Sequence, residues 1–272
     1  MLKNKTIFIT GASRGIGREI ALRCAKDGAN IVIAAKTIEP QPPLTGTIYT
    51  VAEEVIAAGG NALPIQLDIR HEDEIAAGVE TAVKHFGGID ILVNNASAIN
   101  LSSTLKTSMK RFDLMMAVNV RGTFATTQAC IPHLQLSSNP HVLTLSPPLN
   151  MQSKWFKNHL AYTMSKYGMS MCTLGWAEEF RADGIAVNSL WPKTTIATAA
   201  IEVHFPKEIL FASRKPTIVA DAAYCILTSP SKEVTGNFFV DEEVLKKHGI
   251  SDFSVYAYST SAKKLYPDLF LD

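Results

Sequence analysis

The sequence lacks the features that mark nucleic-acid-binding and membrane-spanning proteins. Its formal net charge is only +1, from 26 Lys and Arg residues against 25 Asp and Glu residues. Nucleic acids and anionic membranes are bound by proteins that carry a basic patch. The apolar runs are no longer than a strand, whereas a bilayer-spanning helix needs about 20 apolar residues. We therefore expect no nucleic-acid partner and no membrane span.

Cysteine and histidine are too scattered to indicate a disulfide framework or a metal site. The four cysteines include no Cys-x-x-Cys pair, and none of the seven histidines pairs with a cysteine or an acid at the spacing of metal ligands. No apolar stretch near the N-terminus is long enough for a signal peptide. We expect no metal site, and reduced, mostly buried thiols in a cytoplasmic protein.

The length and composition favour a globular fold with a large core. The chain has 272 residues, of which 47% are hydrophobic and 19% charged, so disorder is not expected. Such a length suits one large α/β domain or two small ones. Because no repeat, charge block or low-complexity linker divides the chain, we expect a single domain over residues 1–272.

Short apolar runs rich in β-branched residues alternate with stretches of helical periodicity. The expected strands are residues 5–10, 31–35, 62–67, 89–94, 141–145 and 185–190, with a plausible seventh at 238–241. The expected helices are residues 15–27, 48–58, 72–85, 109–118, 122–135, 160–181 and 218–227. Alternation of this kind predicts an α/β fold of the Rossmann type, a doubly wound parallel sheet of about seven strands with helices on both faces.

Two connections are too long to be plain turns. They are residues 36–47, which contain three prolines, and residues 193–216. Long loops in compact domains are often lids or binding loops, and the alternative is a surface excursion without function. The sequence alone leaves both readings open.

A glycine-rich turn, residues 10–17, follows the first expected strand and opens the first expected helix. Gly11 allows the tight turn, Gly15 allows backbone to approach a pyrophosphate, and Gly17 allows the helix to pack closely on the strand. The free N–H groups of the helix N-terminus favour phosphate. No Gly-Lys-Ser/Thr ending is present, so a nucleotide triphosphatase loop is disfavoured. The contacts expected from this turn are Gly11, Ser13, Arg14, Gly15, Ile16 and Gly17.

The end of the second expected strand carries a cue to the type of dinucleotide. Proteins that bind NAD usually place an acid there to bond the ribose 2′-hydroxyl, but this chain reads Ala34-Ala35-Lys36. Lys36 and Arg14 together would attract a 2′-phosphate. We therefore expect NADP(H), with NAD(H) as the alternative if Lys36 is an ordinary solvated lysine.

Tyr162 and Lys166 lie four residues apart within an expected helix, which places both side chains on one face. A phenol normally holds its proton until about pH 10, and a neighbouring ammonium lowers that value. The pair would then exchange protons near neutral pH. The same spacing occurs by chance on many exposed helices, so its weight comes from the nucleotide-binding turn in the same chain.

Taken together, these motifs resemble those of the short-chain dehydrogenase/reductase family over essentially the whole chain. The matching pieces are residues 10–17, Asp68 after the third strand, residues 94–96 after the fourth, Asn119, and Tyr162 with Lys166. The stretches 30–36, 146–150, 161–171 and 190–194 further resemble the hydroxysteroid dehydrogenase-like branch. Animal members of that branch carry a C-terminal sterol-carrier domain. This sequence ends before one would begin, so we expect the bacterial type without it.

The resemblance implies a role for each matching residue. Asp68 would bond the adenine amino group, and Asn95, within the Asn94-Asn95-Ala96 stretch, would belong to the cofactor site. Asn119 would interrupt its helix and position a water that links Lys166 to solvent. Tyr162 would exchange a proton with the substrate oxygen, while Lys166 would hold the nicotinamide ribose. The resemblance also implies a homodimer or homotetramer.

Two departures from the family pattern concern the reacting end of the site. The family places a hydrogen-bonding serine after the fifth strand, and that position falls on Pro147, which has no side-chain donor. Ser146, one residue earlier, either takes the role or is a turn serine bonded to local backbone. The family's Pro-Gly after the sixth strand reads Pro192-Lys193, so a different loop path is expected there.

Three side chains in the lengthened loop before Tyr162 are open to two readings. Trp155 and Phe156 would either stack on an apolar substrate or pack on the neighbouring helix. His159 would either face the cleft or lie on the surface, and we expect the surface position. The function predicted overall is an NADP(H)-dependent oxidoreductase that interconverts a carbonyl and an alcohol, small or lipid-like. The alternative is a dinucleotide-binding sensor or scaffold with little turnover.

Overall fold

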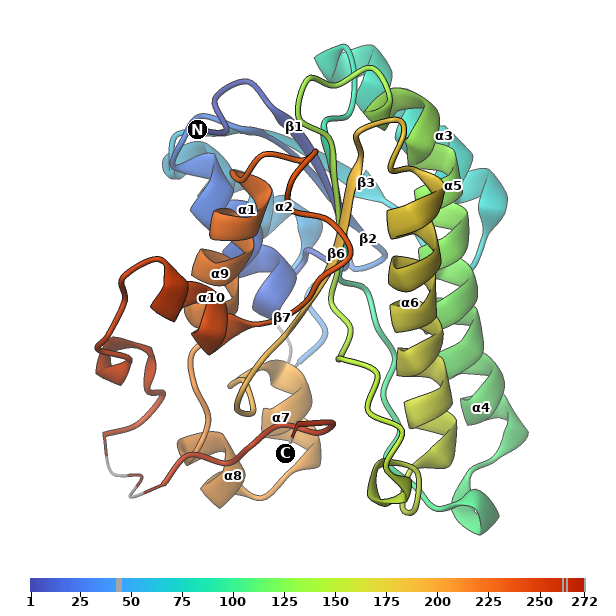
Figure 1. Ribbon diagram of the computed structural model, residues 1–272, viewed down its shortest axis with the longest axis vertical. Helices are drawn as coiled ribbons and strands as arrows, with labels where there is room; N and C mark the ends of the chain where they lie inside the picture. The colour runs from blue at the N-terminus through green and yellow to red at the C-terminus, as the bar shows by residue number, and fades with distance from the viewer. Residues whose placement is uncertain (43–45, 261, 263, 272) are drawn as a thin grey trace.

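The computed structural model describes residues 1–42, 46–260, 262 and 264–271. Its sheet contains seven strands in the order β3-β2-β1-β4-β5-β6-β7, and every neighbouring pair is parallel (Figure 1). The strands are β1 (Thr6–Thr10), β2 (Asn30–Ala35), β3 (Asn61–Gln66), β4 (Ile91–Asn94), β5 (His141–Thr144), β6 (Ala186–Trp191) and β7 (Phe238–Val240). Each lies within one or two residues of its expected position. The predicted doubly wound Rossmann-type fold is confirmed.

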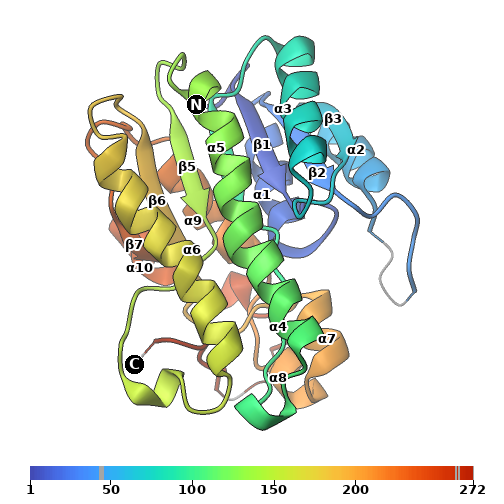
Figure 2. The same ribbon diagram turned by 90° about the vertical axis from the view of Figure 1, so that its right-hand side faces the viewer.

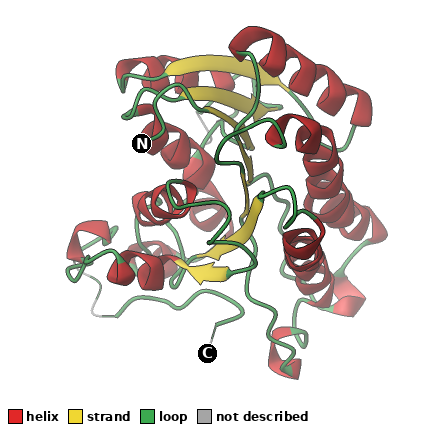
Figure 3. Cartoon of the chain, turned by 45° about the horizontal axis from the view of Figure 1, so that its top comes forward, coloured by secondary structure: helices red, strands yellow, loops and turns green. Residues whose placement is uncertain are grey.

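Helices cover both faces of the sheet (Figure 3). One layer holds α1 (Gly15–Ala25), α2 (Ile48–Ala57), α9 (Thr217–Leu227) and α10 (Asp241–Lys247). The other holds α3 (Glu72–Phe86), α4 (Met109–Met115), α5 (Thr123–Leu134) and α6 (Leu160–Glu179) (Figure 2). Sequential strands on either side of β1 feed opposite layers, which creates a crevice beyond the carboxyl ends of β1 and β4.

Strand β1 shows why its apolar run is continuous rather than alternating. Ile7, Phe8 and Ile9 are all fully buried. Because successive side chains of a strand point to opposite faces, Ile7 and Ile9 belong to one hydrophobic cluster and Phe8 to the other. A central parallel strand with helices on both sides buries both of its faces, and this positions the following turn firmly.

Asn119 lies in a π-helical stretch, Met116–Gly122, that joins α4 to α5. We expected two separate helices here, and the structure shows one continuous rod with a wider turn in its middle. π-Helical turns are rare overall, but those that occur inside α-helices are frequently found at functional sites. The wider turn points the Asn119 amide toward α6, where it bonds Ser165.

The second long connection is not irregular throughout. Residues 193–216, expected as a loop, contain the short helices α7 (Ala199–His204) and α8 (Lys207–Phe211). The helix α10 was also not expected. In the other long connection, residues 43–45 lie outside the described residues, whereas Thr47 caps α2 by accepting the backbone N–H of Thr50.

Candidate dinucleotide-binding and catalytic site

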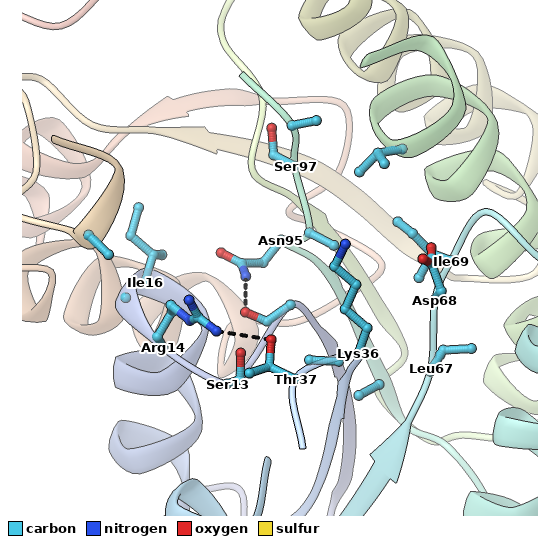
Figure 4. A pocket seen from close by; sticks show the side chains of 18 of the residues that line it. Ser13, Arg14, Ile16, Lys36, Thr37, Leu67, Asp68, Ile69, Asn95 and Ser97 are labelled. Atoms are coloured by element: carbon cyan, nitrogen blue, oxygen red, sulfur yellow. Dashed lines mark hydrogen bonds between the residues drawn. The ribbon is translucent and has the colours of Figure 1, made fainter. Parts of the chain in front are cut away.

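A cavity of about 560 Å³ opens above the carboxyl ends of β1 to β4, at the point where the strand order reverses. Figure 4 shows the side chains that surround it. The residues expected to bind the cofactor that line this cavity are Gly11, Ser13, Arg14, Gly15, Ile16, Lys36, Asp68 and Asn95. Gly17 and Lys166 are not among its lining residues.

The glycine-rich turn has no room for a side chain at Gly11 or Gly17. Gly11 adopts φ +67, and a Cβ there would lie 2.8 Å from the Cα of Ala96. At Gly17 a Cβ would lie 2.5 Å from Nδ2 of Asn95. Such contacts are closer than real Cβ atoms make, so only glycine fits this path. The result is a cradle of exposed backbone at the start of α1.

Asn95 holds this turn against β4. Its Nδ2 donates to the backbone oxygens of Thr10 at 2.9 Å and Gly11 at 3.1 Å. Its side chain therefore fixes the shape of the turn while also lining the cavity (Figure 4). Gly17 contributes from outside the cavity wall, because its missing side chain is what admits the Asn95 amide.

Two cations border the side of the cavity next to β2. Arg14 donates through Nη2 to Thr37 Oγ1 at 2.9 Å and to the Gly46 oxygen at 3.4 Å, and partial burial lowers its pKa from the usual value. Lys36 is exposed and extends across the mouth of the cavity (Figure 4). The strand end before it, Ala34-Ala35, offers no acid. This rim carries net positive charge where an anion would meet it.

Asp68 is engaged by a residue that the sequence analysis did not single out. Arg70 donates to both oxygens of the Asp68 carboxylate, through Nε at 3.0 Å and through Nη2 at 2.6 Å. The bond from Arg70, with the charge of Lys36 as a smaller contribution, holds the pKa of Asp68 below its ordinary value. Both residues line the cavity. The Asp68-Ile69-Arg70 sequence after β3 is the feature from which this pairing could have been predicted.

The long connection after β6 folds over the glycine-rich turn. Thr198 and Ala199, at the start of α7, line the cavity. The methyl group of Thr198 lies 3.5 Å from where a Cβ of Gly15 would be. Of the two readings of this connection, the structure therefore supports a wall of the binding site rather than an excursion remote from it.

Tyr162 and Lys166 lie in the first two turns of α6, and both are buried, at 5% and 2% exposure. The Lys166 ammonium Nζ donates to the Leu145 backbone oxygen at 2.7 Å and lies 3.4 Å from Ser97 Oγ. Ser97 in turn lines the cavity. Lys166 therefore stands directly behind the cavity wall, with Ser97 between its ammonium and the open space.

Burial dominates the proton affinities of this pair. It lowers the pKa of Lys166 to about 7, against the attraction of Asp268. It also raises the pKa of Tyr162 above the ordinary value for a phenol, and the negative charge of Asp268 adds to the increase. The expectation that Lys166 lowers the Tyr162 pKa is wrong for this state of the protein, because desolvation penalises the phenolate more strongly.

Asn119 is fully buried and clamps two segments together. Its Oδ1 accepts the Ala98 N–H at 2.7 Å, and its Nδ2 donates to the Ala98 oxygen and to Ser165 Oγ, both at 2.9 Å. It thus joins the loop after β4 to the helix that carries Tyr162. Both Nδ2 hydrogens are used, and one lone pair of Oδ1 remains.

Ser146 is fully buried, and within the described residues its Oγ has no hydrogen-bond partner. The reading of Ser146 as a turn serine bonded to local backbone is therefore wrong for its hydroxyl. Pro147 accepts a bond from Ser170 Oγ at 2.6 Å through its carbonyl oxygen. An unpaired buried hydroxyl costs about 1–3 kcal/mol, and such groups concentrate where a ligand supplies the missing partner.

The changed Pro192-Lys193 pair is held by backbone contacts. The Lys193 N–H donates to Asp241 Oδ1 at 2.8 Å, and the Lys193 oxygen accepts from the Asp268 N–H at 3.2 Å. The neighbouring Thr194 is buried, and its Oγ1 is a second hydroxyl without a partner among the described residues. The loop therefore has a lysine, held by its backbone, where the family has a flexible glycine, and the next residue, Thr194, has a buried hydroxyl that lacks a partner.

The loop before α6 packs inward. Trp155 contacts Phe270 at 5.9 Å between ring centroids, and Phe156 contacts Tyr167 at 5.5 Å. Phe156 thus packs on the neighbouring helix α6, which is the second of its two readings. His159 was expected on the surface, and this is wrong: it is buried, and its ring lies 6.5 Å from the ring of Tyr162.

Within the described part of the chain, no cluster of three or more His, Cys, Asp or Glu residues has the arrangement of a metal site. No helix there combines the length and hydropathy needed to cross a bilayer. All four cysteines are free thiols, and burial raises the pKa of Cys24 and Cys130 to about 12. These two thiols are therefore unreactive.

The family model for short chain dehydrogenases matches residues 5–207. Hydroxysteroid dehydrogenase-like protein 2 of Danio rerio is 61% identical over 267 residues, which cover 98% of this chain and 64% of that protein. The Homo sapiens protein of the same name is 60% identical and is covered to 63%. The chain thus spans less than two thirds of these relatives.

A solved structure shows the same likeness over nearly the whole fold. The crystal structure of a short chain dehydrogenase from Mycobacterium thermoresistibile superposes with a TM-score of 0.94 at 52% identity. The match covers 100% of this chain and 96% of that one. The chain therefore belongs to the short-chain dehydrogenase/reductase family, whose enzymes depend on NAD or NADP.

Proposed function

We propose that the protein is an NADP(H)-dependent oxidoreductase that interconverts a carbonyl and an alcohol, with Tyr162 as its general acid and base. The observation that carries this proposal is the burial of Tyr162 on the same helix as Lys166, whose ammonium lies behind the wall of the proposed dinucleotide cavity. Lys166 reaches that wall at Ser97, 3.4 Å away. Charged groups with strongly shifted pKa values beside a cavity are typical of catalytic sites.

The cavity suits a dinucleotide in shape and chemistry. The cradle at Gly11 and Gly17 has backbone where a Cβ would not fit, as pyrophosphate binding requires. Ser146 Oγ and Thr194 Oγ1, which do not belong to the cavity lining, are buried hydroxyls that lack partners among the described residues. The residues that would hold the cofactor are Gly11, Ser13, Arg14, Gly15, Ile16, Lys36, Asp68 and Asn95, with Gly17 shaping the turn and Lys166 at the ribose. When bound, the cofactor supplies the hydride.

Tyr162 is suited to hand over a proton in the direction of reduction. The phenol is protonated at neutral pH and so can donate to a carbonyl oxygen; because burial raises its pKa, the transfer also needs the phenolate to be stabilised. The phenolate left behind is stabilised by a protonated Lys166, whose pKa of about 7 keeps both forms populated near neutrality. Asn119 fixes α6 and the Ala98 loop relative to each other, so the donor keeps its direction.

For the cofactor we propose NADP(H) over NAD(H). Arg14 is preorganised by its bond to Thr37, and Lys36 extends over the same part of the cavity (Figure 4). Neither Ala34 nor Ala35 repels a phosphate. The 2′-phosphate distinguishes the two cofactors, and a pair of cations without an acid favours the phosphorylated one.

For the state of the protein in the cell we propose a homodimer or homotetramer in the cytoplasm. Apolar side chains on the outer faces of α5 and α6 are exposed, among them Phe124 at 49% and Leu174 at 55%. A contiguous apolar helix face favours association with a second copy. We also propose that residues 1–272 act as one cofactor-binding domain.

A second candidate function is a dinucleotide-binding sensor or scaffold with little turnover. It is favoured by the 5% exposure of Tyr162, which is absent from the lining of the cavity. It is also favoured by Pro147, which cannot donate a hydrogen bond. An enzyme and a sensor differ in whether carbonyl compounds accelerate cofactor oxidation.

The test follows NADPH and NADH oxidation with a panel of aldehydes, ketones and lipid carbonyls. We expect wild-type protein to reduce at least one compound, and Tyr162→Phe to lose at least 100-fold, since general acid catalysis contributes about 10²–10⁴. Tyr49→Phe, at a half-exposed tyrosine in α2, serves as the matched control. Dinucleotide binding without oxidation by any compound would favour the sensor, and an unchanged rate in Tyr162→Phe would remove Tyr162 from the reaction.

A further inference from the structure

The carboxyl-terminal residues 266–271, here called the terminal plug, run along the loop that follows β6 (Figure 1). The Tyr266 oxygen accepts from the Thr195 N–H at 3.0 Å, and the Asp268 N–H donates to the Lys193 oxygen at 3.2 Å. The Leu269 oxygen accepts from Trp191 Nε1 at 2.9 Å. These bonds lead the plug to the first turn of α6, where Tyr162 lies.

Phe270 is the innermost residue of the terminal plug, with 1% exposure. Its ring lies among five others, here called the aromatic cluster. Centroid distances to Phe270 are 5.3 Å for Tyr167, 5.8 Å for Trp191, 5.9 Å for Trp155, 6.0 Å for His159 and 6.2 Å for Tyr162. The phenyl ring therefore occupies an apolar position directly beside the proposed catalytic phenol.

This position conflicts with turnover as the structure stands. A general acid must come within hydrogen-bond distance of the substrate oxygen. Tyr162 is 5% exposed and does not line the cavity, and Phe270 packs on its ring. A substrate that approaches the Tyr162 ring from this side would have to take the place of Phe270.

Two features oppose the seated position of the plug. Phe270 adopts φ 72, a left-handed conformation that is unfavourable for a bulky residue. Asp268 is half-buried, and within the described residues it forms no ion pair; its carboxylate accepts only the Leu269 N–H, at 2.7 Å. Burial raises the pKa of Asp268 to about 7. Both features are relieved when the plug leaves, while burial of the phenyl ring favours its return.

We propose that the terminal plug is displaceable and that Phe270 stands in for the apolar part of the substrate, so that the substrate is a carbonyl compound with a hydrocarbon chain or ring that fills the aromatic cluster. The expected change in KM depends on the proposed reductase function, whereas displacement of the plug by an apolar ligand does not. Short polar carbonyls would not displace the plug, because they offer too little apolar surface to replace the ring.

The kinetic test compares decanal with propanal as substrates of the full chain, with NADPH as cofactor. Removing the ring in Phe270→Ala frees the aromatic cluster, so we expect a severalfold lower KM for decanal. Propanal, which cannot displace the ring in wild type, should be reduced faster by Phe270→Ala than by wild-type protein. Phe270→Gly removes the ring and suits φ 72 without strain, which guards against misfolding. Tyr258→Ala, at a half-exposed ring outside the cluster, should behave as wild type. A higher KM for decanal in both Phe270 variants would make Phe270 a fixed wall and overturn the proposal.

A second readout does not depend on turnover. Hydrogen–deuterium exchange of the peptide that spans the terminal plug reports on the amides of Tyr266 and Asp268, which are bonded to Ala212 and Lys193. Saturating decanamide, which is not reduced, should accelerate their exchange in wild-type protein, and propionamide should not. Unchanged or slower exchange, or no binding of decanamide by calorimetry, would overturn the proposal.

The two readouts separate this inference from the proposed function. If no carbonyl compound is reduced but decanamide still accelerates exchange in the terminal plug, the proposed redox function is refuted and the proposal of a displaceable plug is supported. If decanal is reduced while exchange and KM do not respond to the ligand or to Phe270→Gly, the function stands and the plug fails.

Discussion

Replacing Lys36 by alanine tests the proposed preference for NADP(H). Two unit charges 4 Å apart in water attract by about 1 kcal/mol, and a phosphate monoester carries about 1.5–2 negative charges near pH 7. Lys36 is exposed, so solvent screens it and its contribution is about 1.5–2 kcal/mol at low salt, or about 10- to 30-fold in affinity. At physiological salt, with a Debye length of about 8 Å, about 5- to 8-fold remains.

The assay is calorimetric titration of NADPH and NADH at low and physiological salt. We expect Lys36→Ala to weaken NADPH by these factors and to leave NADH within about twofold, while Lys36→Asp reverses the preference by adding repulsion. Lys110→Ala, at an exposed lysine of α4 outside the cavity, is the charge-matched control. Equal losses for both cofactors, or tighter binding of NADH by wild-type protein, would refute the assignment of Lys36 to a 2′-phosphate.

Three further predictions concern stability, cofactor binding and rate. Burial lowers the pKa of His141 from 6.5 to about 4, so between pH 7 and 5 the unfolded chain takes up a proton on this residue and the folded chain does not. In urea titrations, the unfolding free energy of wild type should fall by about 1.8 kcal/mol more than that of His141→Asn over this pH range. Equal decreases in the two proteins would contradict this. Gly17→Ala places a Cβ 2.5 Å from Asn95 Nδ2 and should abolish dinucleotide binding, whereas the Cβ of Gly175→Ala has no neighbour within 4 Å and should leave binding unchanged. Retained affinity in Gly17→Ala would show that the turn at Gly11 and Gly17 does not bind the pyrophosphate. Ser146→Ala should raise the unfolding free energy by up to about 1–3 kcal/mol, because it removes a buried hydroxyl that lacks a partner. It should also lose about 10²–10³ in rate, and a wild-type rate would assign the substrate oxygen to other donors.

Much of the fold followed from local pattern. The period of the apolar residues and the strand-helix alternation are local signals, and a central strand such as β1 shows them at full strength because both of its faces are buried. The helices α7 and α10 were missed because they are short and are held by tertiary contacts. Asp241, for example, begins α10 and accepts the backbone N–H of Lys193, far away in sequence.

The site was predictable where it depends on backbone and spacing. The glycine-rich turn and the four-residue spacing of Tyr162 and Lys166 can be recognised directly in the sequence. The proton affinities were not, because desolvation depends on how the whole chain covers α6. Phe270 could not be placed for the same reason, since it meets Tyr162 across more than a hundred residues. Arg70 was overlooked because a cation two residues from Asp68 is unremarkable before its geometry is known.

The most direct test of the account is whether deuterium moves from the C4 position of labelled NADPH into the carbonyl carbon of an apolar aldehyde. Mass spectrometry of the alcohol formed by wild-type protein, Tyr162→Phe and Tyr49→Phe would answer it. The account predicts one deuterium per product molecule in wild type and in Tyr49→Phe, and a rate at least 100-fold lower in Tyr162→Phe, in line with general acid catalysis. Alcohol without deuterium, or equal label and rate in all three proteins, would contradict it.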